Sequence, residues 1–227
     1  MHADLAEKLG YTFKSNELLS RSLTHKSFDN EFPKKSKGHN ERLEFLGDAV
    51  LDLALSDYLM KRFPELNEGE LSKIRASLVN EKVLAEVALE LGLENLIRFG
   101  KGEFKSGGSL KPRLLSCAFE ALVGALYRDS DFQNTNDIIL KIFFDRIENL
   151  DLETHFKSDY KTHLQEKLQG MLKQIPNYEL EREEGPDHNK VFFVKIKIDD
   201  QVVATGTGRS KKQAEQDAAR IALENLL

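Results

Sequence analysis

An apolar segment near residue 40 carries acidic side chains along one face of a predicted helix. Glu41, Glu44 and Asp48 are spaced i, i+3 and i+7, and Asp52 falls on the same narrow arc. No Lys or Arg shares this stripe, although like charges at such spacing repel one another. The other positions between residues 43 and 55 are mostly apolar. A divalent cation against the stripe would explain the pattern, and the ordinary alternative is a solvated surface face.

A second isolated acid lies much further along the chain. Glu120 is the only charged residue between Leu114 and Tyr127. Because an unpaired carboxylate is costly to bury, Glu120 must reach solvent at a helix edge, pair with an arginine, or join the acidic stripe. In the last case the carboxylates form a set of hard oxygen ligands. Such a set favours Mg²⁺, or Mn²⁺ in its place, over zinc.

The composition is that of a soluble globular protein of one or two domains, with 227 residues. The single cysteine excludes an internal disulfide and fits a reducing compartment. We find neither a membrane-spanning apolar run nor a signal peptide, and therefore expect a cytoplasmic protein without membrane contact. The net charge is −5, yet residues 155–227 hold 12 basic and 12 acidic residues. The acidic excess thus belongs to the first part of the chain, which suggests two parts with different tasks.

Apolar residues recur with the helical period through most of residues 1–150, with little alternation of period two. Breaks fall at residues 32–38, at Phe63-Pro64 and in a loop at 100–108. Residues 1–150 are therefore predicted to form an all-α domain. Its helices are expected at about 15–25, 40–62, 69–79, 80–91, 112–129 and 135–148.

The pattern changes after a linker that we predict at residues 149–157. A helix is expected at 159–169, strands at 178–184, 191–198 and 201–208, and a last helix at 211–226. This α-β-β-β-α order predicts a small α+β domain over residues 155–227.

Three regions of the second domain suit contact with RNA. The start of the last helix offers free backbone N–H groups and basic side chains to a phosphate. The first helix has a polar, nearly uncharged face, and a loop between strands holds a histidine. Each region taken alone also has an ordinary interpretation without a ligand: a solvated helix cap, a solvated helix face and an inert loop histidine. Together they match two minor grooves of A-form RNA and the phosphates between them. The residues are Ser210, Lys211 and Lys212; Thr162, Gln165, Glu166 and Gln169; and His188.

Ordered motifs along nearly the whole chain resemble those of bacterial ribonuclease III. Residues 40–51 (NERLEFLGDAVL) are similar to the family's signature helix. Segments similar to its other motifs follow the family's order at 22–27, 67–72, 101–108 and 118–125. Residues 159–166, 185–188 and 210–219 resemble a double-stranded-RNA-binding domain. The ordered set is highly specific.

The resemblance implies a homodimer that uses Mg²⁺ to cut both strands of an RNA duplex. It implies products with 5′-phosphate and 3′-hydroxyl ends, and processing of ribosomal RNA precursors and structured transcripts. Phe45 matches an aromatic side chain that reaches into the partner subunit, and Glu68 matches an acid lining the cleft.

The site residues also follow from the resemblance. Glu44 and Glu120 match metal-binding carboxylates, with Glu120 also catalytic. Asp48 matches the catalytic residue that organises the attacking water with the metal, and Glu41 matches a further acid of the site.

One position departs from the family's pattern. The family has an aspartate three residues before the glutamate of the second motif, and here that position is Cys117. A thiol is soft and mostly protonated near neutral pH, so it is a poor Mg²⁺ ligand. Either water replaces the missing oxygen and metal binding weakens, or the site prefers a softer ion, or catalysis is impaired, or the other carboxylates suffice.

The sequence thus predicts a Mg²⁺-dependent, double-strand-specific endoribonuclease. The alternative is a catalytically impaired regulatory protein that binds double-stranded RNA, and Cys117 alone favours it. A helical metal-binding or interaction protein without an RNA partner would require the motifs of the second domain to be coincidental.

Overall fold

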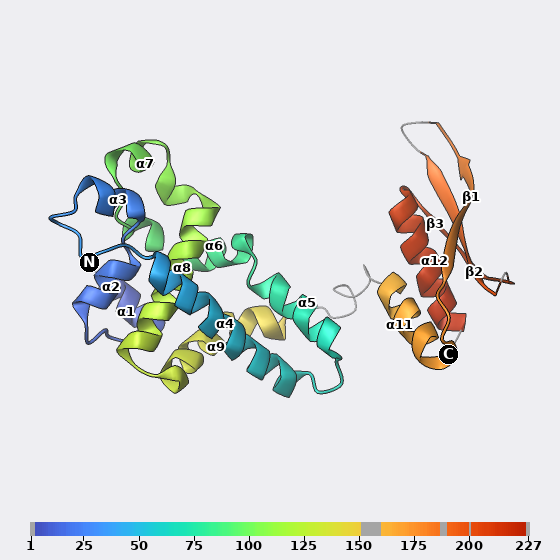
Figure 1. Cartoon of the computed structure of the whole chain (residues 1–227), viewed down its shortest axis with the longest axis horizontal. Coiled ribbons are helices and arrows are strands. Elements are labelled where there is room, and N and C mark those ends of the chain that lie inside the picture. The colour runs from blue at the N-terminus through green and yellow to red at the C-terminus, as the bar shows by residue number, and fades with distance from the viewer. Residues whose placement is uncertain (1–2, 151–159, 187–189, 200, 226–227) are drawn as a thin grey trace. The chain divides into compact units, whose positions relative to one another are not determined.

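The computed structural model describes residues 3–150, 160–186, 190–199 and 201–225. The chain divides into two compact units, Met1–Leu150 and Asp151–Leu227, and each is described by itself (Figure 1). The predicted linker at 149–157 lies outside the described residues from residue 151 onward, and so does His188.

The first unit is helical, as the period of its apolar residues predicts. Apart from a single bridge between Thr24 and Arg98, its described residues contain no strand pairing. Two 3-10 turns lie at Leu93–Asn95 and Gly108–Leu110. The α-helices are α1 (Ala3–Leu9), α2 (Asn16–Ser22), α3 (Lys26–Glu31), α4 (Glu41–Arg62), α5 (Glu68–Leu78), α6 (Glu81–Glu90), α7 (Lys101–Lys105), α8 (Pro112–Asp129) and α9 (Phe132–Glu148).

The helix expected at residues 15–25 is present as α2, but it ends at Ser22, before the expected boundary. Thr24 then bridges to Arg98, and the backbone N–H of Ser27 donates to the ring of His25, which caps α3. Three short helices, α1, α3 and α7, were not expected, and α7 occupies part of the predicted loop at 100–108.

The two long helices α4 and α8 lie in direct backbone contact at a pair of glycines. A methyl group placed on Gly47 would stand 1.7 Å from the carbonyl oxygen of Glu120. One placed on Gly124 would stand 2.1 Å from the carbonyl oxygen of Leu43. Only glycine permits this approach, because any side chain would force the helices apart. The crossing brings the acidic stripe of α4 beside the apolar helix that carries Glu120.

The second unit has the predicted α-β-β-β-α order. Its strands β1 (Asn177–Glu184), β2 (Val191–Ile198) and β3 (Gln201–Gly208) form one antiparallel sheet in that order. Helices α11 (Tyr160–Leu172) and α12 (Lys211–Asn225) share a core with the sheet. Leu164 and Leu168 of α11 pack there with Ile196 of β2 and the alanines of α12. The polar face of α11 therefore points away from this core.

Candidate active site

A pocket of about 510 Å³ lies where α4 crosses α8. It brings together residues from both sequence motifs and from the start of α3. We call it the acidic pocket. Its charged and polar lining consists of Glu41, Glu44, Asp48, Glu120, Cys117, Asn40, His25, Lys26 and Arg113, and Phe45 is among its apolar lining residues.

Cations from other helices neutralise the two ends of the acidic stripe. Lys26 Nζ lies 2.9 Å from the carboxylate of Glu41 and holds the pKa of that carboxyl below its usual value. At the other end, the Arg75 guanidinium of α5 lies 3.7 Å from Asp52. Between them, Glu44 and Asp48 form no ion pair with any basic residue in the described ranges. The uncompensated negative charge is thus concentrated in the middle of the stripe.

Glu120 adds a third uncompensated carboxylate. Burial, and to a smaller extent the nearby charges of Asp48, Glu44 and Asp52, together raise its pKa to about 7. The raised pKa means that the pocket resists a further negative charge when no cation is bound. A divalent cation would relieve this repulsion, and carboxylate oxygens are ligands that Mg²⁺ and Mn²⁺ accept.

Cys117 does not fit as a ligand of a hard cation. Its half-buried thiol donates a hydrogen bond to Glu44. Burial, that hydrogen bond, and the charges of Glu44 and Glu120 raise the pKa of the thiol to about 12. The sulfur therefore stays protonated at physiological pH and offers no thiolate to the pocket.

The carboxylates line the pocket without converging on one point. Within the part of the chain that the structure describes, no three His, Cys, Asp or Glu side chains are grouped closely enough to hold a metal ion. Like charges repel one another when no cation lies between them, so separated carboxylates are expected in this state, and the exposed side chain of Asp48 has room to change its rotamer.

His25 and Arg113 are among the lining residues that were not singled out from the sequence. His25 lies in the 22–27 motif, and the backbone N–H of Ser27 donates to its Nδ1 at 3.3 Å. Burial lowers the pKa of His25, which favours the neutral ring. Arg113 precedes Cys117 and Glu120 by four and seven residues on α8. That helical spacing was the signal that would have identified it.

Of the two remaining predicted residues of the first unit, Phe45 lines the acidic pocket and Glu68 does not. Phe45 is 81% exposed at the rim of the acidic pocket. Glu68, at the start of α5, accepts a hydrogen bond from the Ser72 hydroxyl at 3.1 Å and does not line the pocket of its own protomer.

The predicted RNA-binding residues that are described lie on the surface of the second unit. Gln165, Glu166 and Gln169 are exposed on α11, and Thr162 is half-buried. Ser210 accepts a hydrogen bond from the backbone of Gln213 at 3.2 Å, which confirms it as the cap of α12. Lys211 and Lys212 follow, both exposed. Lys211 Nζ lies 3.9 Å from Glu183, a distance that leaves it free to move to a phosphate.

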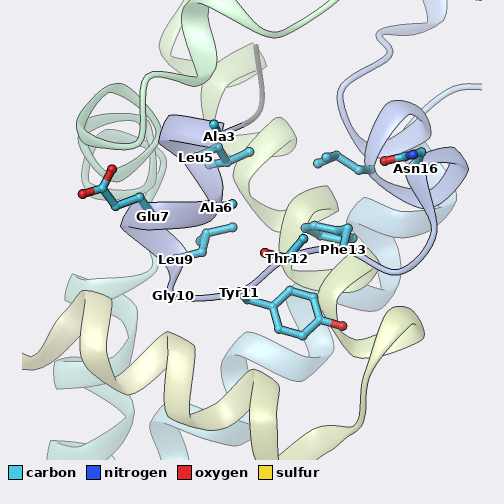
Figure 2. Close-up of a pocket in the computed structure, with 11 residues that line it drawn as sticks. Ala3, Leu5, Ala6, Glu7, Leu9, Gly10, Tyr11, Thr12, Phe13 and Asn16 are labelled. Atoms are coloured by element: carbon cyan, nitrogen blue, oxygen red, sulfur yellow. The ribbon is translucent and has the colours of Figure 1, made fainter.

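A second cavity of the first unit, about 580 Å³ in volume, has a different character (Figure 2). It is lined by α1 and the segment that follows it, and most of its lining is apolar. Glu7 is the one acid in that lining, and the Tyr11 hydroxyl already donates to Asp129 at 2.8 Å. Its lining therefore lacks the carboxylate cluster of the acidic pocket.

In the described ranges, the structure contains no helix of the length and apolarity needed to cross a membrane.

Comparison with known proteins agrees with this geometry. A family model described as "Ribonuclease-III-like" matches residues 15–147, and one described as "Double-stranded RNA binding motif" matches residues 160–226. Ribonuclease 3 of Bdellovibrio bacteriovorus is 51% identical, over 97% of this chain and 94% of its own length. Ribonuclease 3 of Listeria monocytogenes is 41% identical, over 99% of this chain and 97% of its own.

A solved structure is similar to the first unit. The nuclease domain of ribonuclease III from Campylobacter jejuni is 43% identical, with a TM-score of 0.59, and the match covers 65% of this chain and 97% of that one. A second structure of the same domain is described by the flexibility of a region involved in dimer formation. Both the matched families and these relatives show that the chain belongs to the ribonuclease III family of endoribonucleases and carries a double-stranded RNA binding motif.

Proposed function

We propose that this member of the ribonuclease III family is a Mg²⁺-dependent endoribonuclease specific for double-stranded RNA, which works as a homodimer in the cytoplasm. Its products carry 5′-phosphate and 3′-hydroxyl ends, and its substrates include ribosomal RNA precursors and structured transcripts. The observation that carries the proposal is the set of three unpaired carboxylates in one pocket of a chain that also has a double-stranded RNA binding motif. The family relatives favour this function over the catalytically impaired alternative.

Glu44, Asp48 and Glu120 are the residues that would hold the ion. A bound Mg²⁺ supplies positive charge for the phosphoryl oxygens and lowers the pKa of its water. Asp48 is exposed on the pocket side of α4, where its carboxylate can accept a hydrogen bond from the attacking water. Glu120, whose pKa is raised to about 7, would have to be deprotonated to serve as a ligand of the cation. Cys117 stays protonated and keeps Glu44 in place through its hydrogen bond.

Two acids have supporting places in this proposal. Glu41, paired with Lys26, is a further acid at the edge of the site. Glu68 is assigned to the cleft that the dimer would form because it matches a cleft acid of the family.

The second unit supplies most of the affinity for the duplex. Lys211 and Lys212 would contact phosphates across the major groove, and Ser210 fixes the start of their helix. The polar face of α11 would meet ribose hydroxyls in a minor groove. This face consists of Thr162, Gln165, Glu166 and Gln169.

Cleavage of end-labelled RNA tests the proposal directly. An RNA duplex, the same strands unpaired, and a DNA duplex are each incubated with Mg²⁺, with Mn²⁺, with Zn²⁺ and with a chelator. We expect cutting of the RNA duplex with Mg²⁺ or Mn²⁺ only, with product ends that accept a 3′ ligation adaptor. Tight duplex binding without cutting under any of these conditions would instead establish the regulatory alternative.

Replacing Cys117 with Asp should lower the Mg²⁺ concentration needed for half-maximal cleavage. The substitution adds a hard, charged oxygen donor beside Glu44 and Glu120, where the thiol provides none. A Cys117→Ser variant is the matched control, because it changes sulfur to oxygen without adding charge. A Mg²⁺ requirement that stays the same or rises in the Asp variant would show that this position does not serve the metal.

Truncating Phe45 to Ala should weaken dimerisation. The ring is 81% exposed in one protomer, and burying it in a partner gains the energy of a core phenylalanine, about 3–5 kcal/mol. We expect the dissociation constant of the dimer to rise at least about 100-fold in analytical ultracentrifugation. Phe104→Ala, which removes another exposed ring on α7, is the control. An unchanged dimer at low concentration, or a fully active monomeric wild type, contradicts the prediction.

Changing Lys211 and Lys212 to Ala should weaken binding of every RNA duplex by a similar factor, whatever its sequence. Fewer counterions are released, so the log–log slope of affinity against salt should fall by about one for each lost phosphate contact. Gln165→Ala should instead reduce the preference for RNA over DNA duplexes and leave the slope nearly unchanged. If the double variant kept the wild-type affinity and the wild-type salt slope, the two lysines would be solvated residues of a helix cap and not phosphate ligands.

A further inference from the structure

One face of α8 carries a positive charge into the acidic pocket. Arg113, Cys117 and Glu120 are spaced i, i+4 and i+7, and all three line that pocket. The carboxylates of α4 lie opposite them. The lining therefore has an anionic part, formed by Glu44, Asp48 and Glu120, and a part near the start of α8 that offers hydrogen-bond donors.

Arg113 remains available for a ligand. Its side chain is exposed, and within the described ranges it forms no ion pair with an acid. Lys26, the other strong base in the lining, is already engaged with Glu41 at 2.9 Å. A guanidinium presents a planar set of N–H donors that matches two oxygens of a phosphate, so Arg113 is suited to a phosphodiester that enters the pocket.

A second donor is fixed by hydrogen bonds at the same pocket. The backbone N–H of Ser27 donates to His25 Nδ1 at 3.3 Å, and the Ser27 hydroxyl lies 2.8 Å from the same nitrogen. The backbone N–H of Gly100 donates to that hydroxyl at 2.9 Å. Because Nδ1 accepts, the neutral ring carries its proton on Nε2, and Nε2–H has no partner in the described part of the chain.

Because residue 117 is a cysteine, the positive charge of Arg113 becomes important for phosphate binding in the acidic pocket. Phosphodiester hydrolysis builds negative charge on the phosphoryl oxygens, and fixed positive charges must offset it. Cys117 occupies the α8 face between Arg113 and Glu120, and a neutral, soft thiol recruits no hard cation there. Arg113, one helical turn earlier, is the nearest fixed positive charge on that face.

We propose that Arg113 and His25 bind the phosphate oxygens of the RNA strand in the acidic pocket, and that Arg113 supplies positive charge where Cys117 leaves cation binding incomplete. The inference rests on the proposed nuclease function and adds two substrate-binding residues to it. It also explains how a family member with a cysteine at this position remains a nuclease.

Variants at Arg113 separate the phosphate contact from a structural role. Arg113→Met should lower kcat/KM at least about tenfold. Arg113→Lys should keep part of the activity, because the lysine ammonium still provides a positive charge. Arg128→Met, on the last turn of the same helix and outside the acidic pocket, is the matched control and should change neither kinetics nor binding. Circular dichroism and the Tm show whether each variant folds.

Combining Arg113→Met with Cys117→Asp tests whether the charge of Arg113 compensates for the cysteine. In the Cys117→Asp background the new carboxylate can recruit a cation. The factor by which Arg113→Met lowers kcat/KM should therefore be at least about fivefold smaller there than in the wild-type background. Equal losses in the two backgrounds would overturn the proposed charge replacement. His25→Asn keeps an oxygen that can cap α3 and removes the Nε2 donor, so it should lower kcat/KM severalfold without lowering the Tm. Unchanged kinetics in this variant would remove His25 from the site.

Binding without metal provides a readout that does not depend on catalysis. With a chelator present and a short RNA duplex as the probe, Arg113→Met should reduce the salt slope of affinity by about one. A wild-type slope would mean that Arg113 does not contact RNA phosphate. If the wild-type enzyme fails to cut duplex RNA with either Mg²⁺ or Mn²⁺, the proposed function fails, whereas the salt slope still reports whether Arg113 contacts the RNA.

Discussion

Glu120→Gln is expected to reduce the cleavage rate at least about 100-fold while the affinity for duplex RNA stays within about twofold of wild type. The amide keeps the shape of the side chain and removes the charge that, in the proposed site, would hold the cation together with Glu44 and Asp48. In the proposed division of tasks, duplex affinity comes mainly from the second unit, which the substitution does not touch. Single-turnover cleavage and filter binding of the same labelled duplex measure the two effects.

The pH dependence of the Mg²⁺ requirement checks the same assignment. Because the pKa of Glu120 is raised to about 7, a proton competes with the cation below that pH and not well above it. The Mg²⁺ concentration for half-maximal activity should therefore fall as the pH rises through 7 in the wild type. Glu81→Gln, on the exposed start of α6, is a control that should behave as wild type. Robust Mg²⁺-dependent cutting by Glu120→Gln would remove this residue from the ligand set.

Gly47→Ala is expected to destabilise the first unit by more than about 3 kcal/mol. Its methyl group would stand 1.7 Å from the carbonyl oxygen of Glu120, and backbone at that position cannot rotate away as a side chain could. The two helices must then separate, which also moves Glu44 away from Glu120. We expect a large fall in Tm together with loss of cleavage, measured by thermal unfolding and the duplex assay.

Gly102→Ala is the matched control for Gly47→Ala. Gly102 lies in α7, and a methyl group there would meet no atom within 4 Å. Its stability should change by less than about 1 kcal/mol in either direction. A Gly47→Ala protein with wild-type stability and activity would show that the backbone contact is not required by the fold.

The long helices were predictable because their signals are local. Apolar residues at the helical period continue through both α4 and α8, and the predicted ranges 40–62 and 112–129 agree with the observed Glu41–Arg62 and Pro112–Asp129. The early end of the helix expected at 15–25 has a tertiary cause, because Thr24 lies outside the helix and forms a bridge with Arg98. No periodicity within residues 15–25 reports on a partner so far along the chain.

The candidate site was predictable in its acids and not in its cations. Spacing placed Glu44 and Asp48 on one helix face, and the apolar run around Glu120 singled out that acid. The neutralising Lys26 and Arg75 come from α3 and α5, so only the packed fold shows which carboxylates remain unpaired. The roles of these residues in metal binding stay predictions.

The glycine contact between α4 and α8 also has a consequence for synthesis of the protein on the ribosome. The chain emerges from its N-terminus, so α4 with Glu44 and Asp48 is made before α5, α6 and α7, and Glu120 follows only with α8. Gly47 has no partner until Gly124 of α8 is available to pack against it. The carboxylates of α4 therefore meet Glu120 late in synthesis. Until then the acidic pocket is incomplete, while the nascent chain is still next to the structured RNA of the ribosome.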